Sequence, residues 1–465
     1  MKKKWRVLAI IAGAVVLVTV GAVFYANREH PDYVRAAKLL PAARQEAEAM
    51  FGPLTWDEFR AENGIDFQDD TAAWEEVVSN IPQAVKTQYE TRGPLRNERA
   101  VFLAEREWFF QVRSQVQDLR IMHVLAEDGE FWAYSFNSYT EIIKALGVGI
   151  DGAAEVGDAE AVLEIGRAAN SIIAAFNEEP SFIHHLVTFA LLVIIDHVIL
   201  SAAVRNRSNP AMLKSLQTVL NERPPILTIR EVMSADARSE SIYFEQLRTM
   251  SPLKIDDWLD EYAAAARPEP PLLKIVYNAS ERVTGERPTL KRRTGNKTAA
   301  ALEARRLEVM VRYTILFENL VNKEPDARRR INVLADRIEQ TVDRSYELAT
   351  YLMFSTVVYV HISYAFNEAA LRSAIALLGR YPDYEDLPET LPADLSFADP
   401  FGGGSVIYRK TPRGFLIYSR SMNGTDDGYP LSDPDELGQE ASMVFYLNRE
   451  DAGLIVSYDP ITPAP

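Results

Sequence analysis

The chain has 465 residues, of which 47% are hydrophobic and 25% are charged, and this composition excludes a largely disordered protein. Its formal net charge of −16 argues against a protein that neutralises nucleic-acid phosphates along a basic face, so we expect no nucleic-acid partner. Because the chain contains no cysteine, disulfides, thiolate metal sites and cysteine nucleophiles are excluded.

An uncharged run near the N-terminus predicts where the protein resides. Residues 7–26 are enough to cross a hydrocarbon core of about 30 Å as a helix. The cations before the run, which favour a cytoplasmic start, are Lys2, Lys3, Lys4 and Arg6. We therefore predict a signal anchor over residues 1–26 in a bacterial inner membrane, with the bulk of the chain in the periplasm. A signal peptide cleaved near Val20-Gly21-Ala22 is the alternative.

Helix signals dominate residues 27–385, with an interruption in the middle. We predict a first helical part over 27–263, a Pro-rich basic linker over 264–298 and a second helical part over 299–385. The segment Arg267-Pro268-Glu269-Pro270-Pro271 cannot continue a helix. Because no fixed period repeats along this body, we expect an irregular array of helices rather than a regular solenoid.

Local patterns in the first helical part predict particular boundaries. Thr55-Trp56-Asp57-Glu58 fits a capping box that starts a helix. Residues 97–125 have the apolar spacing of one long amphipathic helix. Farther on, Gly157-Asp158 separates two helices that we expect over 139–150 and 159–176.

Two later apolar runs predict core helices rather than further membrane spans. Residues 186–195 are too few to cross a bilayer, and residues 349–366 include hydroxyl side chains and a histidine. The second run lies in a helical stretch over 327–380, in which we expect a break near Asn367.

The predicted linker contains a local basic patch in an acidic protein. Its cations are Lys274, Lys291, Arg292, Arg293 and Lys297. A solvated linker explains these residues, and a contact for anionic lipid or for an acidic partner is the alternative interpretation.

One glycine-rich segment resembles a nucleotide-binding motif without its context. Gly147-Val148-Gly149-Ile150-Asp151-Gly152 fits GxGxxG, but that motif follows a strand, and here a helical pattern precedes it. We interpret it as a helix C-cap and loop. The chain also lacks a GxSxG elbow and a Walker A sequence, so we expect no enzyme and no cofactor of these classes.

Four histidines and one aspartate are the best candidates for a transition-metal site: His184, His185, Asp196, His197 and His361. On one helix, adjacent histidines point about 100° apart, so a single helix cannot close a coordination shell. The chain contains neither HExxH nor a Glu-x-x-His pair. Core histidines that are hydrogen-bonded to backbone or carboxylates are the alternative.

Helical patterns give way to strand patterns in a C-terminal module over residues 386–460. The hairpin turn Thr411-Pro412-Arg413-Gly414 joins the first two predicted strands. We expect a small antiparallel sheet packed on the helix that ends at Gly379, because such a sheet is unstable alone. The four strands are predicted over 405–410, 414–419, 443–447 and 454–456.

Several short blocks near the C-terminus carry a family resemblance. They are Gly379-Arg380-Tyr381-Pro382, Asp399-Pro400-Phe401-Gly402, Tyr408, Tyr418-Ser419 and Asn423-Gly424, in this order. In these blocks the chain resembles the C-terminal domain of the type II secretion major pseudopilin, which implies an α+β fold for this part. The whole chain, with a membrane anchor followed by a long helical body and this tail, is similar to membrane-anchored envelope proteins of planctomycete-like bacteria. Residues 7–26 lack the Gly-Phe cleavage site and the glutamate of pseudopilins, so filament assembly is not implied.

The resemblance also implies a calcium-binding loop. Its ligands here would be Asn423, Asp426 and Asp427, with Asp433 and Asp435 nearby. Hard oxygen ligands at this density suit calcium. An ordinary Asx-rich surface turn is the alternative.

These predictions combine into one expectation for the whole chain. We expect a mainly α protein with an N-terminal transmembrane helix, an irregular multi-helix body and a small C-terminal antiparallel sheet. We expect a non-catalytic binding or scaffolding protein of the cell envelope, with a protein partner there. The alternatives are a component of a secretion or pseudopilus-like assembly and a helical metal-dependent hydrolase built on the four histidines.

Overall fold

The computed structural model divides into two compact units, each assembled from separate stretches of chain. The first lies within 1–64, 236–316 and 330–354, and the second within 65–235, 317–329 and 355–465. The predicted signal anchor, most of the basic linker and the predicted calcium loop lie outside the described residues. The structure describes residues 34–35, 37–63, 70–90, 97–119, 136–178, 182–238, 296–322, 344–400, 404–411, 414–419, 443–447 and 452–457.

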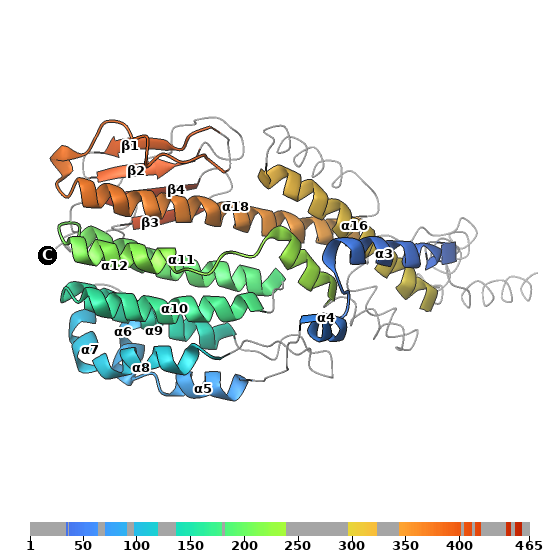
Figure 1. Cartoon of the computed structure of the whole chain (residues 1–465), viewed down its shortest axis with the longest axis horizontal. Coiled ribbons are helices and arrows are strands. Elements are labelled where there is room, and N and C mark those ends of the chain that lie inside the picture. Colours follow the sequence, from blue (N-terminus) through green and yellow to red (C-terminus); the bar gives the residue numbers. More distant parts are fainter. Residues whose placement is uncertain are drawn as a thin grey trace, which may run out of the picture. The chain divides into compact units, whose positions relative to one another are not determined.

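The second unit is built on three consecutive helix pairs, which we call the helix-pair stack (Figure 1). Each helix packs against the helix two positions along the chain, so α9 lies against α7 and α11, and α10 lies against α8 and α12. This arrangement is the packing pattern of helical repeat arrays. The members are α7 (Glu98–Ala104), α8 (Arg106–Val116), α9 (Phe136–Glu155), α10 (Ala159–Glu178), α11 (Phe182–Arg205) and α12 (Pro210–Asn221). Two further helices, α5 (Thr71–Ser79) and α6 (Gln83–Glu90), also pack on α9.

The single helix predicted over 97–125 is wrong, because the chain breaks at Glu105. The side chain of Asn97 caps α7 by accepting a hydrogen bond from the Ala100 N–H at 3.1 Å. Glu105 then leaves helical geometry, at φ −110° and ψ 20°. The break lets α7 pack on α9 while α8 packs on α10.

The glycine-rich segment lies inside α9, so its interpretation as a C-cap and loop is also wrong. A Cβ atom on Gly149 would lie 2.6 Å from the ring of Phe109, and one on Gly152 would lie 2.4 Å from the carbonyl oxygen of Glu98. These glycines therefore allow α7 and α8 to approach α9 closely. The helix continues through them because tertiary packing outweighs their low helix propensity.

The predicted break at Gly157-Asp158 is confirmed, since it separates α9 from α10. Gly157 has φ +74°, a conformation that glycine adopts without strain. The Asp158 carboxylate then accepts the Ala161 N–H at 3.0 Å and caps α10. It also accepts a hydrogen bond from Arg106 at 2.6 Å, which ties α8 to the start of α10.

α11 is the described helix that is long and apolar enough, from His184 to Arg205, to cross a membrane. The expectation that the apolar run over 186–195 is too short to cross a bilayer is therefore wrong, because the helix that contains it is longer than the run. Most of that helix is buried among its neighbours in the stack, as expected for a core helix.

The predicted break near Asn367 does not occur. Helix α18 (Arg344–Arg380) runs through this position, and the Asn367 side chain is buried in it. Arg372 of α18 donates to the carbonyl oxygen of Leu220 and to the side chain of Asn221, both at 2.5 Å. This contact holds α18 against the C-terminal end of α12, whose last carbonyl groups lack partners inside their own helix.

The C-terminal module is an antiparallel sheet of four strands, as the sequence predicts, and the structure shows the order β1-β2-β4-β3 (Figure 1). Strand β3 packs against α11. The helix that ends at Gly379, α18, is tied to the segment before the sheet, where the Ser373 hydroxyl donates to the carbonyl oxygen of Leu395 at 2.8 Å. The expected packing of the sheet on this helix stays a prediction. The strands are β1 (Ile407–Thr411), β2 (Gly414–Tyr418), β3 (Met443–Leu447) and β4 (Ala452–Ser457), and a 3-10 turn, η2 (Tyr384–Asp386), follows α18.

Two sequence blocks of the module meet in the fold. The buried Ser419 hydroxyl lies 2.8 and 2.9 Å from the two carboxylate oxygens of the buried Asp399 and donates to that carboxylate. The Tyr408 hydroxyl donates to the carbonyl oxygen of Pro388 at 3.0 Å. These contacts fix the segment between α18 and β1 against the sheet.

The first unit contains η1 (Ala37–Leu39), α3 (Leu40–Phe51), α4 (Trp56–Asn63) and the part of α16 (Asn296–Asn322) that ends at Leu316. The predicted capping box is confirmed, because the Glu58 N–H donates to the Thr55 hydroxyl at 3.3 Å and that hydroxyl donates to the Glu58 carboxylate at 2.8 Å.

Candidate functional site

In the described part of the second unit, five buried or half-buried ionisable groups come from three segments of chain. Asp196 and His185 come from α11, Arg223 follows the end of α12, and His361 and Tyr364 come from α18. We call these five residues the buried polar cluster. A charged side chain buried in a helical core costs free energy unless it has a partner. The contacts of these residues therefore show what role they have.

An ion pair forms the centre of the cluster. The Arg223 guanidinium donates to the Asp196 carboxylate, and both side chains are almost fully buried, with 1% and 2% of their surface exposed. A second nitrogen of Arg223 donates to the Tyr364 hydroxyl at 3.5 Å. The Tyr364 ring packs in turn against Ile173 and Leu192. The pair therefore connects α11, α18 and the segment after α12 inside an apolar shell.

Burial and the facing charge act in opposite directions on the pKa of each partner of this pair. Burial raises the pKa of Asp196, and the facing Arg223 guanidinium opposes that rise. Burial disfavours the charged form of Arg223, but the facing Asp196 carboxylate outweighs this effect and raises the pKa of Arg223 above its ordinary value. Burial also raises the pKa of Tyr364 to about 12, so its hydroxyl stays protonated.

The two histidines of the cluster face each other across the α11–α18 contact. Their ring centroids lie 6.4 Å apart, and the ring planes are inclined by 22°. The ring of His361 also has a hydrogen bond to the backbone of Leu227. Among the atoms that the structure describes, Nε2 of His185 and Nδ1 of His361 have no hydrogen-bond partner.

Burial keeps both imidazoles neutral. Burial, with His361 as a second cause, lowers the pKa of His185 from 6.5 to about 4. Burial also lowers the pKa of His361, which the hydrogen bond to Leu227 opposes. Neutral imidazoles in a core are compatible with the structural interpretation of these histidines.

The segment after α12 is held in place by its own local contacts. Thr228 and Glu231 form a capping box, in which the Glu231 N–H donates to the Thr228 hydroxyl at 3.2 Å and the Thr228 N–H donates to the Glu231 carboxylate at 2.7 Å. The Asn177 side chain donates to the carbonyl oxygen of Pro225 at 2.9 Å. These contacts position Arg223 for Asp196.

The histidine pair predicts an acid-sensitive fold. Below pH 6.5 the unfolded chain binds a proton at His185, whereas the folded chain does so only near pH 4. Stability that is present above pH 6.5 is therefore lost as the pH falls toward 4, by about 3 kcal/mol. We expect the unfolding free energy of His185→Phe to fall less between pH 7 and pH 4 than that of the wild type. Urea unfolding of both proteins at the two pH values measures this difference. An identical acid loss in both proteins would contradict the assignment.

The structure brings together two of the four histidines predicted for a metal site. His185 and His361 are neighbours, the ring of His184 packs edge-on against Phe176 at 5.6 Å, and His197 is exposed. The described ranges contain no group of three or more His, Asp or Glu side chains placed to hold a metal. The described residues therefore provide no set of metal ligands that supports the hydrolase alternative.

Calcium binding by Asn423, Asp426 and Asp427 stays a prediction, because this loop is outside the described part of the chain. We expect millimolar calcium to raise the melting temperature of the protein relative to chelator, and we expect Asp426→Asn with Asp427→Asn to abolish that rise. An equal melting temperature in calcium and chelator would rule the site out.

Sequence reasoning missed Arg223 and Tyr364. Asp196 is the signal that points to them, since a carboxylate in the middle of a long apolar helix needs a buried partner. Nothing in the residues around Arg223 identifies it as that partner.

The geometry of the buried polar cluster favours a structural role. Its ion pair, tyrosine and neutral imidazoles are used to hold α11, α18 and the segment after α12 together. Comparison of the chain with protein-family models, with curated proteins and with solved structures found no match in any of the three.

Proposed function

We propose that this protein is a non-catalytic binding or scaffolding component of a bacterial cell envelope, anchored in the inner membrane by residues 7–26. The observation that carries the proposal is the helix-pair stack, in which each helix packs on the helix two positions along the chain. Arrays of this type present extended surfaces to partner proteins. The basic start and uncharged run at the N-terminus support the anchor and the periplasmic side.

Site-specific photo-crosslinking in living cells tests the binding role. A photoreactive residue is placed at Gln111 on α8 or at Gln217 on α12, both exposed positions of the helix-pair stack. We expect crosslinking to a discrete protein partner at one or both positions, and loss of that product in a chain without residues 1–26. Absence of any crosslinked product at both positions would contradict the proposal.

A second candidate is a component of a secretion or pseudopilus-like assembly. The order of blocks from Gly379 to Gly424 favours it, together with the four-stranded module that follows α18. This role predicts that the protein purified from native membranes carries secretion machinery with it. A protein that purifies without any such component would exclude it.

A further inference from the structure

Two imidazole rings meet in the contact between α11 and α18. The ring centroids of His185 and His361 lie 6.4 Å apart, with an angle of 22° between the ring planes. Nε2 of His185 and Nδ1 of His361 have no hydrogen-bond partner among the described atoms. A proton added at either nitrogen creates a charged N–H donor without an acceptor, next to a second ring that can also become charged. Such a donor costs free energy as long as it stays buried, and it loses that cost in water.

No described carboxylate compensates for a charge on the histidine pair. Among the described ionisable groups, the one whose charge affects the pKa of His185 is His361. Asp196 lies about 16 Å farther along α11 and pairs with Arg223, and β3, which also packs on α11, has no charged residue. The charged residues of the helices around α11 have other partners or are exposed: Asp151 and Glu155 of α9 pair with Arg205, Glu164 and Arg167 of α10 pair with each other, Glu368 of α18 pairs with Arg372, and Lys214 of α12 is exposed.

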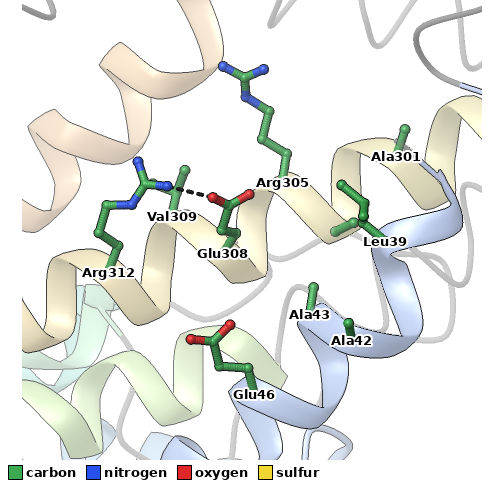
Figure 2. A pocket seen from close by; sticks show the side chains of 10 residues that line it. Leu39, Ala42, Ala43, Glu46, Ala301, Arg305, Glu308, Val309 and Arg312 are labelled. Carbon is green, nitrogen blue, oxygen red and sulfur yellow. Dashed lines mark hydrogen bonds and ion pairs between the residues drawn. The ribbon is translucent and has the colours of Figure 1, made fainter. Parts of the chain in front are cut away.

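Ionisable groups at the surface are in a different situation, as the groove between α3 and α16 in the first unit illustrates (Figure 2). Glu308 and Arg312 line this groove and form an ion pair, but 52% and 65% of their side chains are exposed. Water therefore solvates either charge when the other is lost, and a change of pH at such a pair has little effect on the fold. His185 is only 2% exposed, so water does not solvate a charge on its ring.

The other contacts of this region allow α18 to separate from α11 without leaving a buried charge unpaired. Asp196 and Arg223 come from α11 and from the segment after α12, so their ion pair does not depend on α18. The hydrogen bond from Arg223 to the Tyr364 hydroxyl of α18 is long, at 3.5 Å, and is therefore weak. Farther along α18, Arg372 holds the helix on the C-terminal end of α12. The part of α18 around His361 can therefore open locally.

We propose that the histidine pair is an acid-operated latch between α11 and α18. At neutral pH both rings are uncharged, and the segment of α18 around His361 lies on α11. In acid, both rings take up protons and this contact opens, while the rest of the second unit stays folded. The inference goes beyond the proposed function, because it concerns control by pH and requires no partner.

The direction of the change follows from where each form binds protons. In the open form both histidines titrate near the ordinary pKa of about 6.5, whereas burial lowers the pKa of His185 to about 4 in the closed form. The open form therefore binds more protons as the pH falls below 6.5. We expect the equilibrium constant for opening to rise about 100-fold between pH 7 and pH 4.

Thiol accessibility tests the latch in the purified full-length protein in mild detergent, because the chain has no cysteine of its own. Val357→Cys places one thiol at a fully buried position of α18, one turn before His361 on the same face of the helix. The probe is dithiodipyridine, which reacts with thiols in acid as well as at neutral pH. We expect its labelling rate, divided by that of a small free thiol at the same pH, to be about 100-fold higher at pH 4 than at pH 7. Thr188→Cys, at a buried position of α11, reports the same opening from the other helix.

Two kinds of control separate the latch from general acid unfolding. Ala374→Cys is fully buried on α18 beyond Arg372, and we expect its thiol to stay protected at both pH values. In the Val357→Cys protein, His185→Phe is expected to remove most of the acceleration, whereas His197→Phe, at an exposed position of the same helix, is expected to leave it unchanged. Circular dichroism at pH 7 establishes that each variant is folded, and Thr188→Cys replaces Val357→Cys where the latter is not.

Three results would overturn the latch. Equal acceleration of labelling at Val357→Cys and Ala374→Cys would mean that the whole unit unfolds in acid. Equal labelling rates at pH 7 and pH 4, at both Val357→Cys and Thr188→Cys, would mean that the contact does not open. An acceleration that persists in His185→Phe would assign the opening to other groups.

Discussion

Replacement of Arg223 by alanine is expected to lower the free energy of unfolding of the second unit by about 3–5 kcal/mol, because it leaves the Asp196 carboxylate buried without its partner. Both side chains are almost fully buried, so bulk water does not solvate the Asp196 carboxylate in place of the guanidinium. The measurement is the urea-unfolding transition followed by far-ultraviolet circular dichroism.

Two further variants test whether the loss of stability comes from burial of an unpaired charge. Arg230 pairs with Glu318 at 2.6 Å, but 51% of its side chain is exposed, so Arg230→Ala is expected to cost less than about 1 kcal/mol. Replacement of both buried partners, as Asp196→Leu with Arg223→Met, is expected to restore most of the loss. Equal effects of Arg223→Ala and Arg230→Ala would contradict the assignment of the pair to the core.

Gly152→Ala is expected to destabilise the second unit by at least about 2 kcal/mol. The added Cβ would lie 2.4 Å from the carbonyl oxygen of Glu98 and 2.5 Å from Cβ of Phe102. The first of these atoms belongs to the backbone of α7 and cannot rotate away, so α7 has to move off α9. The helix propensity of alanine offsets only about 1 kcal/mol of this cost.

Gly147→Ala is the matched control on the same helix. Its added Cβ would lie 3.3 Å from one methyl group of Val198, which a small shift relieves. We therefore expect its unfolding free energy to stay within about 1 kcal/mol of the wild type. If Gly147→Ala were as destabilising as Gly152→Ala, the loss of stability would come from replacing a glycine in α9. It would then not come from a clash with α7.

Features that depend on local sequence were predicted well. The strands of the C-terminal module follow from short apolar runs and a hairpin turn, and the structure pairs β1 with β2 in the register that places Thr411 opposite Gly414. The turn at Gly157-Asp158 and the capping box at Thr55 were likewise predictable, because their hydrogen bonds join residues close together in the chain.

Features that depend on packing were not predictable from a single sequence. The break at Glu105 and the helical glycines of α9 follow from which helices lie against α7, α8 and α9, and local propensity favours the opposite in both cases. Arg223 has no local mark of burial, because it lies in a polar stretch before two prolines. Its role follows only from the contact with Asp196 on α11.

The histidines were predicted only in part from the sequence. His185 and His361 were both candidates for metal binding, and the structure places them side by side on α11 and α18. The sequence predicted neither their pairing nor their surroundings, and burial in the core lowers the pKa of both rings.

The proposed partner binding and the predicted calcium site are both periplasmic roles, so they require the helical body to lie outside the inner membrane. Lys214→Cys places one thiol at an exposed position of α12 in a chain that otherwise has none. We predict that a membrane-impermeant maleimide labels this thiol in intact spheroplasts, and that the labelled protein sediments with membranes. The same variant without residues 1–26 is expected to become labelled only after lysis. Labelling of the full chain only after lysis would place the body in the cytoplasm and contradict the account.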